Sequence, residues 1–170
     1  DEIRSMPKPV IAAINGAAAG IGMSYAMTPD LAVMGEGAFL LAPFSTISLV
    51  PDGGATWLLQ KQLGYRRAFQ LAVEAERIDA QRCLDWGLVN RVVPNEDVLS
   101  EAQTWAQSLA ARAPLSLQAT KRTMRHAEAG SWESAFDMEA QIQTNLIGSE
   151  DNVEGVAAFF EKRQPQFKGK

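Results

Sequence analysis

The sequence predicts an α/β fold followed by a helical region, and three observations favour this class. Short apolar runs bounded by Pro, Gly and Asn, typical of buried strands, gather in the first part of the chain. From residue 53 onward, apolar residues recur mostly at helical spacing. The chain has 170 residues, of which 46% are hydrophobic and 21% charged; these are ordinary values for a globular protein with a sizeable core.

The strands are expected early in the chain. The apolar run Val10–Ile14 is followed by Asn15-Gly16, which predicts a buried strand ending in a turn. Leu31–Met34 and Phe39–Leu41 are the second and third expected strands. Between the first two, the small residues and glycines of AAAGIGMSYAM predict a tight turn that runs into a helix.

Helices fill most of the remainder. Leu88–Val93 alternates and predicts one further strand, and Asp151 with Glu154 predicts a capping box for a last helix that runs through Phe160. The other expected helix signals are Gly64 at the end of the first helix, Ala68–Ala72 within the second, Asp79 and Gly87 around the third, Pro94-Asn95 before a long helix, and Pro114 and Ser131 at the starts of two more.

Composition excludes several classes of function. The net charge is −4 and the basic residues are scattered, so nucleic acid is not expected as the partner. No apolar run approaches the ~20 residues of a membrane span. The single cysteine, Cys83, cannot form an internal disulfide and has no metal-ligand pattern around it, so we expect a buried or half-buried thiol, no metal site and a reducing, cytoplasmic compartment. The single histidine, His126, is expected to be solvated or capping.

The first chemical feature is a glycine-rich turn. Gly20 and Gly22 flank Ile21 where a turn meets a helix, and small residues allow backbone N–H groups to approach a ligand closely. A helix N-terminus also favours negative charge. The pattern is not a P-loop, because no Gly-Lys-Ser/Thr follows. A close-packed structural turn is the alternative.

The second chemical feature is a single carboxylate, Asp52, with apolar residues near it in sequence. Asp52 lies between Leu49-Val50 and Gly53-Gly54. It is either a helix cap or turn residue, or a proton shuttle that an apolar shell has desolvated. The side chains expected to form that shell are Phe44, Ile47, Leu49, Val50 and Trp57.

Three separated motifs resemble the enoyl-CoA hydratase/isomerase (crotonase) superfamily. They are KPVIAAINGAAAGIG at residues 8–22, RIDAQRCLDWGLVNRVVP at 77–94 and AAFFEKRQPQFKGK at 157–170. The resemblance covers the C-terminal two-thirds of that family and implies a partial crotonase (ClpP/crotonase-like) fold. It implies that residues 1–94 belong to the core with the acyl-CoA pocket. Residues 95–170 would form a helical oligomerisation region.

The resemblance also assigns roles at the glycine turn. The backbone N–H of Ile21 matches the middle of the family's glycine triplet and would form half of an oxyanion hole for a thioester carbonyl. Gly20 and Gly22 would contact the substrate with it. Hydratases of the family carry two glutamates whose positions are here Ser24 and Phe44. Both acids are absent, which disfavours ordinary enoyl-CoA hydration.

VPDGGATW at residues 50–57 resembles the branch containing ring-epoxide and oxepin isomerases of phenylacetate degradation. This implies an acyl-CoA isomerase in which Asp52 moves a proton next to the thioester and the oxyanion hole stabilises an enolate. Trp57 would line the acyl pocket, with Ser24 and Phe44 also against the substrate. Lys162 matches a family lysine that meets the coenzyme's nucleotide end.

The resemblance implies an acyl-CoA thioester as substrate, coenzyme A as part of that substrate, no permanently bound cofactor and a homotrimer or hexamer. Two alternatives remain: a hydratase or thioesterase-type enzyme, and a truncated, non-catalytic acyl-CoA-binding or oligomeric module. The family's AFxxGxD-type segment, which supplies the second oxyanion donor, does not occur in these 170 residues. We therefore expect a piece of a longer polypeptide, inactive or weakly active alone.

Overall fold

The computed structural model describes all residues 1–170, which divide into two compact units. The sheet unit comprises Val10–Trp105, and the helical unit comprises Asp1–Pro9 together with Ala106–Lys170. This division differs from the predicted boundary at residues 94 and 95 because helix α6 (Val98–Ala110) begins within the sheet unit. The roles predicted for residues 1–94 and 95–170 stay predictions.

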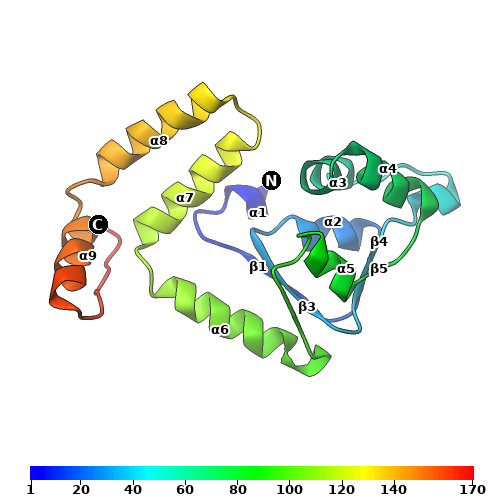
Figure 1. The fold of residues 1–170 in the computed structure, drawn as a ribbon, viewed down its shortest axis with the longest axis horizontal. Helices are drawn as coiled ribbons and strands as arrows, with labels where there is room; N and C mark the ends of the chain where they lie inside the picture. The colour runs from blue at the N-terminus through cyan, green and yellow to red at the C-terminus, as the bar shows by residue number, and fades with distance from the viewer. The chain divides into compact units, whose positions relative to one another are not determined.

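The sheet unit contains two small sheets (Figure 1). The first has the order β1-β3-β6 and is wholly parallel; in the second, of order β2-β4-β5, β2 and β4 are parallel while β4 and β5 are antiparallel. The strands are β1 (Ile11–Ile14), β2 (Ala17–Ala19), β3 (Leu31–Gly35), β4 (Phe39–Leu41), β5 (Ile78–Asp79) and β6 (Arg91–Val93).

A strand-strand-helix unit occurs twice in succession and explains this topology. The first copy is β1, β2 and α2 (Ile21–Met27); the second is β3, β4, the 3₁₀ helix η1 (Phe44–Ile47) and α3 (Ala55–Leu63). Each copy contributes one strand to each sheet, and corresponding strands pair in parallel. Parallel neighbours need a crossover connection, and α2 provides it between the two copies.

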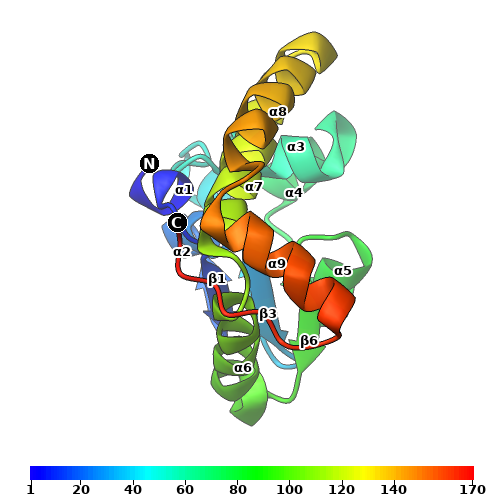
Figure 2. The ribbon, with the colours of Figure 1, turned by 90° about the vertical axis from the view of Figure 1, so that its left-hand side faces the viewer.

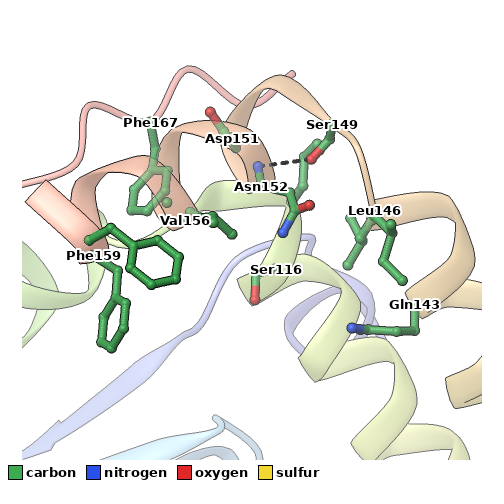
Figure 3. Close-up of a pocket in the computed structure, with 14 residues that line it drawn as sticks. Ser116, Gln143, Leu146, Ser149, Asp151, Asn152, Val156, Phe159 and Phe167 are labelled. Atoms are coloured by element: carbon green, nitrogen blue, oxygen red, sulfur yellow. Dashed lines mark hydrogen bonds between the residues drawn. The ribbon is translucent and has the colours of Figure 1, made fainter.

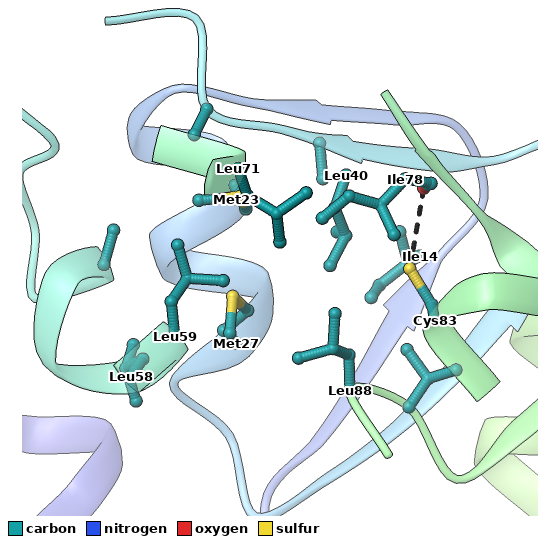
Figure 4. Packing of buried hydrophobic residues seen from close by; sticks show 14 of the residues in the cluster. Ile14, Met23, Met27, Leu40, Leu58, Leu59, Leu71, Ile78, Cys83 and Leu88 are labelled. Carbon is teal, nitrogen blue, oxygen red and sulfur yellow. Dashed lines mark hydrogen bonds between the residues drawn. The ribbon is translucent and has the colours of Figure 1, made fainter. Parts of the chain in front are cut away.

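One apolar core holds the sheets and helices together. Figure 4 shows Met23 and Met27 of α2 packed with Leu59 of α3 and with Leu40 of β4, and all four are buried. A second cluster joins Val33 of β3 to the start of α6, so β3 is buried on both faces, as is usual in parallel sheets. The other elements of this unit are α4 (Tyr65–Glu74), α5 (Ala80–Asp85) and η2 (Asn95–Asp97).

The strand predictions are largely confirmed. Strands form within Val10–Ile14 and at Phe39–Leu41, and Leu31–Met34 lies within β3. Leu88–Val93 is wrong as a single strand, since only its last three residues are extended. The amides of Leu88 and Val89 donate instead to the Cys83 carbonyl and close the end of α5. Strand β2 was not expected.

The helical unit contains α1 (Glu2–Ser5), α7 (Pro114–Ala127), α8 (Trp132–Leu146) and α9 (Glu150–Glu161). The predicted starts at Pro114 and Ser131 are confirmed. Lys121 of α7, although buried, has donor bonds to the carbonyls of Ile3 at 2.8 Å and Lys8 at 3.1 Å. These bonds hold the N-terminal residues against α7. None of the helices has the length and apolarity to cross a membrane.

The cap of α9 corrects a prediction. Ser149, not Asp151, accepts the cap bond, from the Asn152 amide. The Asp151 carboxylate instead accepts the amides of Lys168 at 2.6 Å and Gly169 at 2.8 Å. The C-terminal segment therefore runs back along α9, as Figure 2 shows. The acidic pair predicted as a capping box holds the tail, because Glu154 likewise bonds to residues beyond the helix.

Candidate functional site

Gly20 makes the sharp turn between β2 and α2. Its φ of 57° and ψ of −129° lie in a region that L-residues with a side chain avoid. The amide of Gly20 donates to the Leu41 carbonyl at 3.0 Å, which ties the turn to the end of β4. A Cβ at Gly20 would stand 3.9 Å from the ring of Phe44. Buried Phe44 therefore lies beside the glycine turn.

The turn leaves a backbone donor available at the start of α2. The amides of Met23 and Ser24 donate to the Gly20 carbonyl at 3.0 and 3.4 Å. The N–H of Ile21 has no acceptor within the chain, as expected for the first residue of a helix. Its apolar side chain is partly exposed. The sequence prediction of a ligand-facing N–H at Ile21 is compatible with this geometry.

Gly22, unlike Gly20, is not required to be glycine by its backbone conformation. Its φ is not in the left-handed region, and a Cβ there would meet no atom within 4 Å beyond its own helix turn and chain neighbours. Neither the backbone conformation nor packing inside the chain demands glycine at this position. The face of α2 beside the Ile21 amide is consequently open.

Asp52 lies on the turn that precedes α3, close to the start of α2. Gly53 and Gly54 follow it with φ values of 61° and 91°, so both are left-handed. A Cβ at Gly53 would overlap the Cδ1 atom of Ile21 and stand 2.9 Å from Cβ of Ser24. The turn carrying Asp52 thus interlocks with the first turn of α2. Sequence reasoning singled out Asp52 and Ile21 separately, and the fold brings their segments together.

The expected apolar shell around Asp52 is wrong for this chain. Asp52 is exposed, as are Ile47, Leu49 and Val50, which retain 64%, 59% and 77% of their accessible surface. Ser48, with a left-handed φ of 58°, ends η1 between Ile47 and Leu49. Of the five side chains expected to bury the carboxylate, only Phe44 is itself buried, and it packs toward the glycine turn.

Ser24 connects the two halves of the candidate site. It is only 1% exposed, and its hydroxyl donates to the backbone carbonyl of Asp52 at 2.8 Å. Sequence reasoning placed Ser24 against the substrate and did not find this bond, because the partner lies 28 residues away. The predicted substrate contact of Ser24 stays a prediction.

Trp57 and Lys162 are the remaining predicted contacts. Trp57 lies on the first turn of α3, partly exposed, with the Lys61 ammonium 5.7 Å from its ring centroid. Lys162 is the exposed C-cap of α9 with a φ of 55° and belongs to the helical unit. Both contacts stay predictions.

Of the two residues set aside as non-catalytic, Cys83 is buried, and His126 is half-buried rather than solvated. Cys83 is fully buried, and burial raises the pKa of its thiol to about 12. His126 forms a hydrogen bond with Ser134 inside the helical unit. No group of three or more His, Cys, Asp or Glu side chains gathers in a way that could hold a metal ion.

A cavity of about 450 Å³ lies in the helical unit, and none of the predicted site residues lines it (Figure 3). It lies among α7, α8, α9 and the C-terminal segment, and its lining includes Leu146, Val156, Phe159 and Phe167. Its one carboxylate, Asp151, is engaged by backbone amides. The cavity therefore offers a mixed surface, with Ser116, Gln143 and Asn152 beside the apolar side chains, and no acid–base pair.

Comparison with known proteins gives one consistent family. The family model described as enoyl-CoA hydratase/isomerase matches residues 1–170. The chain is 37% identical to the 1,2-epoxyphenylacetyl-CoA isomerase of Escherichia coli (strain K12) and 36% identical to the 2,3-dehydroadipyl-CoA hydratase of the same organism. Each match covers 99% of this chain but only 64% and 66% of the relative.

A solved structure agrees with these matches. An enoyl-CoA hydratase from Polaromonas sp. JS666 superposes with a TM-score of 0.96 at 41% identity, over 99% of this chain and 65% of that protein. The predicted α/β fold of crotonase type is confirmed by this likeness. The chain spans about two thirds of the length of its relatives.

Proposed function

The chain belongs to the enoyl-CoA hydratase/isomerase family, and we propose that it carries the acid–base residue of an acyl-CoA isomerase. The reaction would shift a double bond or open a ring in a CoA thioester. One observation carries the proposal: a single carboxylate, Asp52, lies on a turn interlocked with the helix start that presents the Ile21 N–H. The two hydratase acid positions hold Ser24 and Phe44.

The Ile21 N–H would act on the thioester carbonyl. When a proton leaves the carbon conjugated with that carbonyl, negative charge develops on its oxygen. A preorganised N–H at a helix start stabilises that charge, and losing one such donor typically costs ~10²–10³ in rate. The open surface beside Gly22 gives a thioester room to approach this donor.

Asp52 would then move the proton. Its carboxylate removes a proton from one carbon of the conjugated system, the electron pair flows to the carbonyl oxygen, and an enolate forms. As the carbonyl re-forms, the same carboxyl group returns the proton to a different carbon, and the substrate is isomerised without gain or loss of atoms. One carboxylate suffices because no water needs activation.

Hydration is less well supported by the residues at the hydratase positions. Ser24 donates its hydroxyl to the Asp52 backbone and has no carboxylate. Phe44 is buried and cannot transfer protons. The relatives include both isomerases and hydratases, so the choice between them rests on Ser24, Phe44 and Asp52.

Product analysis tests the proposal. The full-length protein is incubated with unsaturated acyl-CoA thioesters, including ring-bearing ones, and products are separated by chromatography with mass detection. An isomer of unchanged mass is expected. A product that gains one water would indicate a hydratase, released CoA thiol would indicate a thioesterase, and saturable binding without turnover would indicate a non-catalytic module. Each of these three results would contradict the isomerase.

We further propose that the chain assembles into a closed homo-oligomer, a trimer or hexamer. The helical unit exposes large apolar side chains, among them Trp132, Phe136, Phe159 and Phe160. Exposed ring pairs such as the stacked Trp132 and Phe136 and the edge-to-face Phe159 and Phe160 are typical of interaction sites. Closed symmetry is the usual arrangement of identical subunits and supports a second copy as the partner.

A further inference from the structure

The position of the Asp52 carboxylate depends on its backbone. Asp52 is exposed, and its carboxylate accepts no hydrogen bond from the chain. Two left-handed glycines, Gly53 and Gly54, follow directly. Glycine is the most conformationally free residue, so this turn needs outside contacts to keep one shape. The placement of the carboxylate therefore rests on whatever fixes the turn.

Two donors fix the carbonyl of Asp52. The amide of Ala55 donates to it at 3.0 Å and closes the turn locally. The hydroxyl of Ser24 donates to it at 2.8 Å from a different element, the middle of α2. The Ser24 side chain is buried, so water does not compete freely for this bond.

Ser24 belongs to the same short helix whose first residue is Ile21. A bond from Ser24 to Asp52 thus sets the Asp52 turn relative to the N–H of Ile21, three residues earlier on a rigid helix. Contact between the Ile21 side chain and Gly53 reinforces the same register. The Ser24 hydroxyl therefore links the segment that carries the Asp52 carboxylate to the helix that carries the Ile21 N–H.

We propose that Ser24 is a positioning residue that holds Asp52 in register with the Ile21 amide, acting through the Asp52 backbone. The inference rests on the proposed isomerase function. Proton transfer is sensitive to geometry, and a misplacement of about 1 Å can cost ~10²-fold in rate. Loss of the Ser24 hydroxyl should lower kcat more than it changes KM, because that hydroxyl is donated to the Asp52 carbonyl and acts on the geometry of proton transfer.

A series at position 24 tests the proposal. Ser24→Ala removes the donor and is expected to lower kcat by about 10- to 100-fold, with KM changed less than about twofold. Ser24→Cys keeps the shape with a weaker donor and should fall between Ala and wild type. Ser24→Thr keeps the hydroxyl and should restore most of kcat. The matched control is Ser45→Ala, which removes a 3.0 Å hydroxyl bond to the Val73 carbonyl and should leave kcat unchanged.

Hydrogen exchange provides a readout independent of activity. Amides of the segment 52–58 should exchange faster in Ser24→Ala than in wild type or Ser45→Ala. Wild-type kcat in Ser24→Ala, or unchanged exchange in that segment, would overturn the positioning role. A drop in thermal stability with kcat unaltered per folded molecule would also overturn it, since that is the signature of a purely structural serine.

The two proposals fail in different ways. If the isomerase assignment is wrong, the wild-type protein yields no isomer of unchanged mass, while faster exchange in Ser24→Ala would still report the anchored turn. If only the positioning role is wrong, Asp52→Asn is inactive and Ser24→Ala is active with unchanged exchange. The paired measurements therefore separate the reaction from the anchor.

Discussion

Gly20 and Gly22, on either side of Ile21, have different physical roles. Gly20 has backbone angles that a Cβ would strain, so the fold itself requires glycine there. Gly22 has no such constraint and no neighbour within reach of an added methyl group. If the fold does not require glycine at position 22, the approach of a substrate to the neighbouring Ile21 amide is the remaining use for it.

Alanine at each position should separate these roles. Gly20→Ala is expected to lower the free energy of unfolding by about 1–3 kcal/mol, because it strains the backbone. Gly22→Ala should cost no stability, since alanine is favoured over glycine in helices by about 0.5–1 kcal/mol, but it should raise KM for the acyl-CoA substrate. Urea denaturation measures the free energy of unfolding of each variant, and steady-state kinetics measures its KM. Equal stability losses, or an unchanged KM in Gly22→Ala, would count against this interpretation.

Local residue signals were predictable and nonlocal ones were not. Asp79 and Ser131 cap helices as expected, because a cap bonds within three residues of itself. The exposure of Asp52 could not be foreseen, because the apolar residues Leu49 and Val50 beside it in sequence are themselves exposed in the folded chain. The bond from Ser24 to Asp52 joins segments that meet only in the folded chain.

Among the elements, α9 and the C-terminal segment are joined by several hydrogen bonds and an ion pair. Arg163 forms a bidentate ion pair with Glu154, at 2.6 and 2.9 Å, and the Gln166 amide donates to the same carboxylate at 2.7 Å. The Arg163 bonds, with the Gln166 amide second, lower the pKa of Glu154 from its ordinary 4.5 to about 2. Asp151 holds the segment at its far end.

Glu154→Gln should loosen this segment. A carboxyl whose pKa is depressed by folding stabilises the fold fully above its ordinary pKa, and that contribution is lost as pH falls from 4.5 toward about 2. The acid limb of the stability profile should therefore be shallower in Glu154→Gln. At neutral pH, trypsin should cut faster after Arg163. The control is Glu161→Gln, which removes only a single bond to Arg163; equal cleavage rates in the two variants would contradict the assigned role of Glu154.

The helices and strands that could be predicted are those with a regular spacing of apolar residues or with a helix-capping residue. Strand β2 was not predicted, because Ala17–Ala19 has no β-branched or aromatic residue. Its extended conformation comes from pairing with β4. Asp151 and Glu154 have a spacing that suits a capping box. Their carboxylates are drawn instead to a C-terminal segment whose return path sequence periodicity does not encode.

Across the whole molecule, the crotonase-type fold was recognisable from motifs, while the division into compact units was not. The motif at residues 77–94 ends at Pro94, but α6 continues the sheet unit through Val98 and Ala102, which pack on Val33. The helical unit leaves Phe159 and Phe160 with 79% and 77% of their surface exposed. These rings are the strongest physical support for the proposed oligomer.

Charge placed on this face should weaken assembly. The double variant Phe159→Glu with Phe160→Glu is expected to shift the molar mass in solution toward the monomer, because burying a carboxylate in an apolar interface is costly. Light scattering after size-exclusion chromatography measures the mass. Gln141→Glu, at an exposed polar position on α8, controls for added charge and should keep the wild-type mass. An unchanged mass in the double variant would place the interface elsewhere or remove it.

Replacing the one carboxylate proposed to move the proton, in Asp52→Asn, is the decisive measurement on the proposed isomerase. Isomerisation of an unsaturated acyl-CoA should fall by about 10²-fold or more, the usual contribution of a positioned acid–base group. Acyl-CoA affinity, measured by calorimetry, should stay close to wild type, and Asp85→Asn, which alters an exposed carboxylate on α5, should keep full turnover. Retained isomerisation in Asp52→Asn would contradict the account.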